Sequence, residues 1–388
     1  MATYNLRRFS QPDGLKAIKA DHLLALLTPH RNFFANREIT LSTNGADLDY
    51  GALVKVFMSP DTDTPKALVD ALYHIHEMAT PEGMDELLHE AENNNIHLDD
   101  DPDHSPADVA VQVWLQNKDL LERKHAEQYL TRPRSFEYFQ TEASPVPDFN
   151  HPSTETLTAL QNDMDDWFEK KKRGRGSKVF LYPKNNEVWF LVRHGEPFKR
   201  EGSLEEGQSS SVFYRPEKHD VLVYEKSTGE LRINAKSKGE KDLYRKKFGL
   251  HLFGNEDFFP GTGKYTLEPL KTDGADSLVC TDIEGMGKVI LKEIHFYWGG
   301  AENEREIRKA DNIFAAYQAR GRSIPANARI TKASFQVEFT DSKTPRTVTI
   351  RPSNIAQYAR DDDSTILEKW LDRRKFIIQE DHEENEDA

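Results

Sequence analysis

Asp220, Glu230 and Lys236 are the residues whose types and spacing come closest to a catalytic set. An acidic residue on one strand and an acid-x-Lys pair on the next can hold Mg²⁺ and orient a water molecule, as a metal-dependent nuclease requires. The spacing departs from that pattern, because Arg232 stands two residues after Glu230, and the residue two before Lys236 is Asn234, a poor ligand. Side chains alternate along a strand, so residues 230, 232, 234 and 236 share one face. A solvated strand face is the alternative explanation.

His194 is a second candidate, at the end of a predicted strand. Residues 191–196 read Leu-Val-Arg-His-Gly-Glu. This segment resembles the Arg-His-Gly signature of the histidine phosphatase family, in which the histidine accepts the phosphoryl group. The resemblance covers six residues and implies that His194 is a nucleophile, a role that requires several cations to converge on it. The alternative is a strand-end histidine with a structural role.

Two segments of the chain are rich in cations. The glycines at positions 174 and 176 allow the backbone of the first segment to approach phosphate groups closely. If the two segments are adjacent on the folded surface, they form one patch suited to a DNA or RNA backbone, with little sequence preference. Docking against an acidic protein surface is the competing interpretation, and ordinary solvated faces are the third. The twelve candidate residues are Lys170, Lys171, Lys172, Arg173, Arg175 and Lys178 in the first segment and Lys236, Lys238, Lys241, Arg245, Lys246 and Lys247 in the second.

The distribution of charge limits any contact with a polyanion to one part of the chain. The chain of 388 residues has a net charge of −14, which divides into −12 for residues 1–150, +4 for residues 151–250 and −6 for the remainder. Only the middle third is basic, whereas a protein that coats nucleic acid is normally basic throughout. A hydrophobic fraction of 37% indicates a folded protein rather than a disordered one.

The single cysteine and the absence of long apolar segments bear on location. Cys280 has no partner for an internal disulfide, and a single thiolate excludes a Cys-rich zinc or iron–sulfur site. The sequence has no apolar segment at its beginning and no window of 18 uncharged apolar residues, so we expect neither a secretion signal nor a membrane span. These features predict a protein of the reducing cytoplasm.

The candidate residues must be positioned by hairpins. Residues 178–182 and 187–194 predict one hairpin, and residues 221–224 and 231–236 predict another, with turn residues between the strands of each pair. A basic helix is expected from residue 240 to residue 248. Elsewhere we expect a polar loop at residues 202–211, a strand at 289–298, a helix at 302–320, a hairpin of residues 329–339 and 346–351, and a final helix that begins at Asp363 or Ser364.

The domain prediction follows from a change of periodicity. Helical spacing dominates up to about residue 140, and Ser105, Pro106 and Asp108 give the clearest helix start. We expect a helical domain at residues 1–140, a linker at 141–152, an α+β domain at 153–378 with a sub-boundary near 255–285, and an acidic disordered tail at 379–388. The predicted fold class is α+β, an all-helical domain followed by antiparallel hairpins with flanking helices, because the strands are joined by short turns.

No catalytic motif is complete, so the sequence favours a non-enzymatic adaptor or subunit of a cytoplasmic multiprotein assembly that binds other proteins through the basic segments. A nucleic-acid-binding protein without sequence preference, binding DNA or RNA through the same residues, is the alternative. A divergent nuclease or a histidine-phosphatase-like enzyme is the second alternative. We expect no cofactor, no metal site and no membrane partner.

Overall fold

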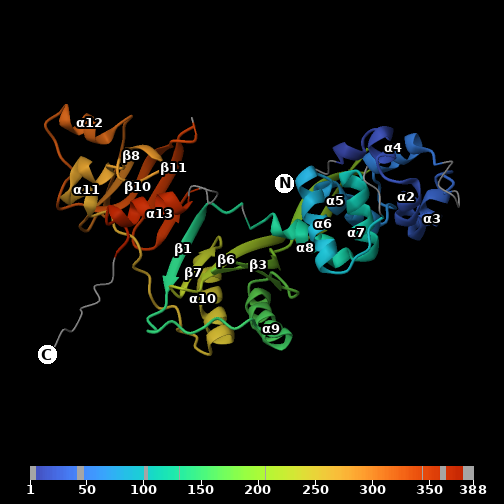
Figure 1. Ribbon diagram of the computed structural model, residues 1–388, viewed down its shortest axis with the longest axis horizontal. Coiled ribbons are helices and arrows are strands. Elements are labelled where there is room, and N and C mark those ends of the chain that lie inside the picture. The colour runs from blue at the N-terminus through green and yellow to red at the C-terminus, as the bar shows by residue number, and fades with distance from the viewer. Residues whose placement is uncertain are drawn as a thin grey trace. The chain divides into compact units, whose positions relative to one another are not determined.

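The computed structural model describes residues 6–41, 48–99, 104–130, 132–205, 207–342, 344–358 and 364–378 (Figure 1). The chain forms two compact units, Met1–Gln128 and Tyr129–Ala388. The acidic tail predicted at residues 379–388 lies outside the described residues. Within the described part of the chain, no helix is long and apolar enough to cross a membrane.

The first unit is helical, as predicted. Its apolar stripes meet in one core that includes Leu53, Leu72 and Val109. The predicted start at Ser105 is confirmed, because the Ser105 hydroxyl accepts a hydrogen bond of 3.0 Å from the backbone N–H of Asp108. The helices are α1 (Pro12–Lys16), α2 (Ala20–Leu27), α3 (Arg31–Ala35), α4 (Tyr50–Met58), α5 (Lys66–Met78), α6 (Pro81–Asn93), α7 (Pro106–Gln116) and α8 (Lys118–Glu127).

The second unit is built on a ten-stranded sheet in the order β2-β3-β6-β7-β1-β12-β11-β10-β8-β9, in which each neighbouring pair is antiparallel. A separate hairpin, β4 with β5, interrupts the chain between β3 and β6. The strands are β1 (Ser135–Gln140), β2 (Lys178–Lys184), β3 (Glu187–Gly195), β4 (Lys199–Glu205), β5 (Gln208–Tyr214), β6 (Glu217–Glu225), β7 (Glu230–Asn234), β8 (Met286–Gly299), β9 (Glu304–Lys309), β10 (Arg329–Phe339), β11 (Arg346–Arg351) and β12 (Ile355–Gln357). This arrangement confirms the predicted α+β class.

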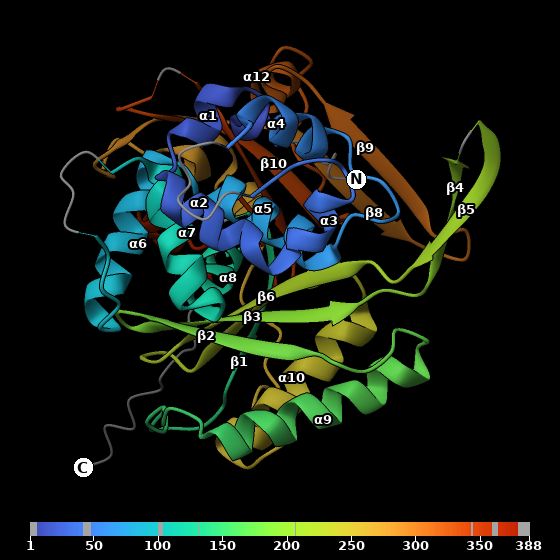
Figure 2. The same cartoon turned by 90° about the vertical axis from the view of Figure 1, so that its right-hand side faces the viewer.

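Two long helices, α9 (Thr154–Lys170) and α10 (Lys238–Phe253), lie side by side against one face of β2, β3, β6 and β7 (Figure 2). Leu160 and Phe168 of α9 and Phe248 of α10 are buried against Phe190 and Leu222 of the sheet. Apolar residues at positions 157, 160, 164 and 168 give α9 the stripe that this packing requires. Three shorter helices, α11 (Pro269–Thr272), α12 (Ile313–Gln318) and α13 (Ser364–Arg373), accompany the other half of the sheet.

The start of α10 is fixed by a capping box. The Ser237 hydroxyl accepts from the backbone N–H of Glu240, and the Glu240 carboxylate accepts from the backbone N–H of Ser237 at 2.6 Å. Gly254, with φ +72°, ends the helix in the left-handed conformation that favours glycine. The cap therefore fixes the backbone position from which the Glu240 side chain projects.

Three segments differ from the predictions. The chain forms strand β1 at Ser135–Gln140 rather than helix, so the predicted domain boundary at residue 140 falls inside the second unit. The predicted helix at 302–320 is instead strand β9 followed by the short α12, and the polar loop at 202–211 is the hairpin of β4 and β5. In each of these segments, pairing with another strand outweighed the helix or loop propensity of the local sequence.

Candidate functional site

Strands β3 and β6 place three polar residues on one face at the end of the helix-covered sheet. His194 is opposite Lys218 and Val192 is opposite Asp220 in the register of the two strands. Alternation puts His194, Lys218 and Asp220 on the same face as the core residue Val192. Their side chains therefore point toward the layer formed by α9 and α10.

The Asp220 carboxylate, which is buried, is the centre of this polar cluster. Its Oδ2 lies 3.0 Å from His194 Nε2 and accepts a hydrogen bond of 2.8 Å from the hydroxyl of Tyr244. Its Oδ1 lies 2.9 Å from Lys218 Nζ. Burial, and then the Asp220 charge beside it, raises the pKa of Tyr244 well above its usual value, so the Tyr244 hydroxyl keeps its proton.

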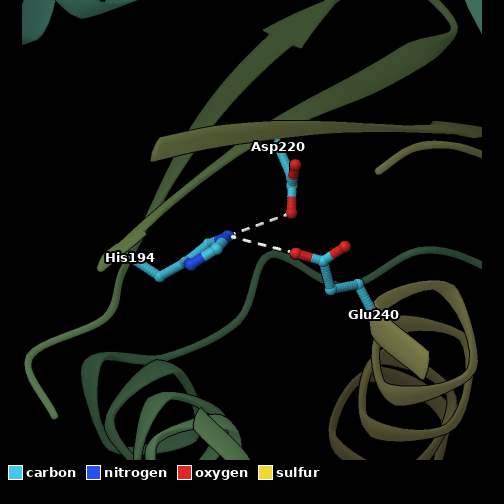
Figure 3. Close-up of side chains that lie close together, drawn as sticks. All are labelled: His194, Asp220 and Glu240. Atoms are coloured by element: carbon cyan, nitrogen blue, oxygen red, sulfur yellow. Dashed lines mark hydrogen bonds and ion pairs between the residues drawn. The ribbon is translucent and has the colours of Figure 1, made fainter. Parts of the chain in front are cut away.

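Glu240 of α10 completes the cluster, with one carboxylate oxygen 4.0 Å from His194 Nε2 (Figure 3). The same oxygen accepts from Lys218 Nζ at 2.8 Å and from Arg173. Burial acts to raise the pKa of Glu240, but the hydrogen bonds from Lys218, Arg173 and Ser237 outweigh it and lower this pKa to about 2. Two carboxylates thus face two permanent cations, and the cluster compensates its own charge.

His194 is held in place by contacts to both ring nitrogens and to one face of its ring. Its Nε2 is bound to Asp220, its Nδ1 lies 2.9 Å from the carbonyl oxygen of Gly195, and the Phe168 ring stacks on it at 4.2 Å. A phosphoryl acceptor needs a ring nitrogen that can reach the substrate. Neither ring nitrogen is free in this arrangement, which favours the structural alternative over the role that the phosphatase resemblance implies.

The grouping of His194, Asp220 and Glu240 has the donor types of a metal site. The Lys218 ammonium, however, lies within 3 Å of both carboxylates, at 2.9 Å from Asp220 and 2.8 Å from Glu240. This ammonium group therefore places a positive charge beside both carboxylates, as a metal cation would do. The residues present therefore form a complete ion-pair network without a metal.

The other members of the predicted nuclease set lie elsewhere. Glu230 is opposite Glu225 at the far end of β6 from Asp220, which places its backbone roughly 16 Å away at the usual rise of a strand. Glu230 and Arg232 are buried, so the predicted solvated face is wrong. Glu230 is bound by Lys264 at 2.6 Å, while Lys236 is exposed beyond the end of β7. Asp220 and His194 come together, and Glu230 and Lys236 do not join them.

The two basic segments meet where α9 ends and α10 begins. Arg173 bonds to Glu240, and Lys171 Nζ lies 5.7 Å from the centre of the Trp167 ring. A Cβ atom at Gly239 would approach the same ring to 3.2 Å. We call this meeting point the basic junction, and define it as the ends of α9 and α10 around Trp167.

Five of the twelve predicted cations already have partners within the protein. Arg173 binds Glu240, Arg175 binds Asp166 and Glu169, Lys241 binds Glu137 at 2.7 Å, Lys247 binds Glu256 at 2.9 Å, and Arg245 donates to the carbonyl of Phe259. The other seven are exposed, and within the described part of the chain they have no carboxylate partner: Lys170, Lys171, Lys172, Lys178, Lys236, Lys238 and Lys246. Among these twelve residues, the cations without a carboxylate partner are therefore all lysines.

Sequence reasoning missed the residues that neutralise the cluster. Lys218 stands two residues before Asp220, a spacing that places both on one strand face, so this signal was present. Glu240 follows Ser237 at capping-box spacing, and Tyr244 follows Glu240 by one helical turn. What the sequence could not show is that β6 and α10 bring these residues to the same place.

The fold and this cluster define a two-unit α+β protein with a buried, charge-compensated His-Asp-Glu set beside a surface of exposed lysines. No protein-family model matches the sequence, and no curated protein matches it.

Proposed function

We propose that the protein is a non-enzymatic adaptor or subunit of a cytoplasmic multiprotein assembly, which docks a partner protein through its second unit. The observation that carries this proposal is the exposed hairpin of β4 and β5. The charge-compensated state of the His194 cluster supports a role in binding rather than in catalysis, because its groups are already engaged with one another.

The hairpin exposes large apolar side chains on both of its faces. Cross-strand partners share a face, so Leu204 and Phe213, which are 76% and 66% exposed, lie on one face. Val212, 47% exposed, lies on the other. An isolated two-stranded hairpin is marginally stable in water, and exposed apolar clusters mark interaction sites. A partner protein that covers these side chains supplies the stabilisation that the hairpin lacks.

The lysines of the basic junction add a charged component to this docking surface. Their charge is free to pair with carboxylates of a partner, which raises association rates and discriminates against basic proteins. The apolar side chains of the hairpin and the lysines of the basic junction would together suit a partner protein that has an apolar groove with an acidic rim.

The test is size-exclusion chromatography of the protein tagged at its own locus, after mild lysis with nuclease. We expect elution in a large complex, and we expect the double variant Leu204→Ser/Phe213→Ser to elute as the free protein. Ile307→Ser is the matched control, since Ile307 is 57% exposed on β9, and it should leave the complex intact. A wild-type protein that elutes alone, or a hairpin variant that stays in the complex, contradicts the proposal.

A second candidate function is binding to a nucleic-acid backbone without sequence preference. The observation in its favour is the half-buried Trp167 ring amid exposed lysines, because aromatic surfaces that stack bases and cations that contact phosphates are combined in such proteins. The lysines supply a salt-dependent affinity, and no base-specific contact is required.

This candidate predicts an affinity for single-stranded DNA or RNA that falls steeply as salt increases. The double variant Lys171→Glu/Lys238→Glu should weaken binding by at least about tenfold and flatten the salt dependence by about one unit of slope for each phosphate that the variant no longer neutralises. Lys288→Glu/Lys369→Glu changes net charge equally at exposed positions elsewhere and should have little effect. Fluorescence anisotropy across a salt series measures both; equal affinity of the two double variants rejects the candidate.

A further inference from the structure

A pocket of about 290 Å³ opens beside the His194 cluster, and its lining includes Gly176, Arg193, Arg215 and Glu217. It lies where β3 ends and β6 begins, with the loop after α9 on one side. None of the twelve cations predicted from the sequence lines it. We call it the Arg215 pocket.

Arg215 is built into this pocket with its charge uncompensated. Its Nη1 donates to two backbone carbonyls, of Lys172 at 2.8 Å and of Glu196 at 3.1 Å, and the Phe198 ring covers the guanidinium at 4.3 Å. No carboxylate is paired with it among the described residues. An arginine has five N–H donors, so the Nε and Nη2 groups keep their capacity to bind an anion.

Two glycines make room for the Arg215 side chain. A Cβ atom at Gly174 would lie 2.9 Å from Arg215 Cζ, and one at Gly195 would lie 2.5 Å from Arg215 Cδ. Gly174 also has φ +76°, where other residues are strained. The backbone therefore holds the guanidinium in one position before any ligand arrives, which reduces the entropy cost of binding.

Arg193 is the second cation of the pocket. Its Nε lies 3.8 Å from Glu217, and both side chains are at least one-third exposed. A surface pair at this distance contributes little, so Glu217 does not hold Arg193 away from a ligand. Lys178 is opposite Arg193 in the register of β2 and β3; it lies outside the lining of the pocket and adds positive charge to this end of the sheet. The charge of the lining, two guanidinium groups against one carboxylate, favours an anion.

We propose that the Arg215 pocket binds a phosphate group. Guanidinium groups bind phosphate oxygens in pairs, and two of them suit the several oxygens of a phosphate better than a single carboxylate. The volume accommodates a phosphate with a small attached group. Because both ring nitrogens of His194 are engaged, the pocket binds this group and does not transfer it. The phosphate comes either from a small phosphomonoester or from a phosphodiester backbone, and the test separates these sources.

The test is calorimetric titration of the full chain with inorganic phosphate, with a nucleoside monophosphate, and with a dinucleotide that lacks a terminal phosphate. We expect saturable binding with Kd of roughly 1 mM or lower. Preference for the monophosphate identifies a small phosphomonoester as the source, and equal affinity for the dinucleotide identifies a phosphodiester backbone. Absence of saturable binding by all three ligands overturns the proposal.

Variants locate the binding. Arg215→Gln should weaken binding by at least about tenfold, and Glu217→Gln should strengthen it severalfold. Arg193→Gln is the second loss variant, because its exposed side chain can be changed without disturbing the loop that Arg215 holds. Arg200→Gln, an exposed arginine on β4, is the matched control and should bind as the wild type does. Unchanged affinity in both Arg215→Gln and Arg193→Gln overturns the proposal.

This proposal is independent of the docking function. Leu204→Ser/Phe213→Ser is expected to abolish complex formation while phosphate affinity stays unchanged, and Arg193→Gln is expected to do the reverse. Complex formation and phosphate binding can therefore be lost separately, and failure of one proposal does not decide the other. A folded state of each variant is verified by circular dichroism.

Discussion

Glu240 shows how strongly a single residue depends on its surroundings. Its carboxylate is buried and accepts from Lys218, Arg173 and the backbone of Ser237, which together lower its pKa to about 2 from an ordinary 4.5. Removing one partner of a buried ion-pair network leaves uncompensated charge behind. We expect Glu240→Gln to lower the free energy of unfolding at pH 7 by about 3 kcal/mol, measured by urea denaturation.

The stabilisation of the folded state by the Glu240 carboxylate depends on pH in a definite direction. Because the pKa of Glu240 is depressed in the folded state, its stabilisation is complete above about pH 4.5 and is lost as pH falls toward 2. The difference between wild type and Glu240→Gln should shrink across that range. Glu256→Gln, which removes an exposed partner of Lys247, is the control and should destabilise the protein much less than Glu240→Gln does, because solvent screens the exposed pair. Equal costs for the two variants at pH 7 contradict this account.

At the scale of single residues, the sequence indicated which residue types could do chemistry, but not which residues would contact one another in the fold. His194 and Asp220 were selected because of their chemistry, and they do lie 3.0 Å apart. Arg215 gave no signal, because its role depends on Gly174 and Gly195 from two other segments. Contacts of that kind depend on strand register and loop conformation, which a local pattern does not contain.

At the scale of elements, the loop between α9 and β2 is shaped by two glycines with positive φ. Gly174 has φ +76° and faces Arg215, whereas Gly176 has φ +102° and no atom within 4 Å of the position that a Cβ would take. Alanine is strained at both positions, but only at position 174 does it also displace Arg215. We expect Gly174→Ala to destabilise the protein by about 1 kcal/mol more than Gly176→Ala, measured by thermal unfolding.

A double-mutant cycle isolates the cause of that difference. In an Arg215→Ala background the displaced side chain is absent, so the two alanine variants should become equally destabilising. An excess cost of Gly174→Ala that persists in that background shows that Arg215 does not cause it.

Elements were predicted correctly where the local signal agreed with the final packing. The hairpin of β2 and β3, strand β8, the hairpin of β10 and β11, and helix α13 are confirmed. Residues 304–309 have five charged side chains and one apolar side chain, and they follow a glycine-rich turn. They pair with β8 as an edge strand rather than forming a helix. Edge pairing depends on a long-range partner, which explains why helical spacing in this segment misled the prediction.

At the scale of the whole molecule, the position of β1 defines the second unit. β1 lies between β7 and β12, so it joins the half of the sheet under α9 and α10 to the other half. A fragment of residues 129–388 contains this strand, while a fragment that begins at residue 141, just past the predicted boundary, lacks it. We expect the first fragment to unfold in one cooperative transition and the second to aggregate or unfold in two steps, as measured by calorimetry and light scattering.

The control for this prediction is the second fragment supplied with a synthetic peptide of residues 129–140, which should restore part of the cooperativity. Comparable cooperative unfolding of both fragments without the peptide contradicts a joining role for β1. The sequence predicts two domains of different class, but it places the boundary at residue 140, because the prolines and the serine of residues 141–152 indicate a linker there and strand β1 stands just before them.

The central place of β1 also bears on how the chain is made. β1 pairs with β7 through residues 230–233, but its other neighbour, β12, begins at residue 355. At ordinary rates of synthesis, roughly 6 to 25 s pass between the emergence of β7 and that of β12. During that interval one edge of β1 has no strand beside it, and unpaired edges invite pairing between chains. Nascent protein on a ribosome should therefore need a chaperone most between the completion of β7 and the arrival of β12.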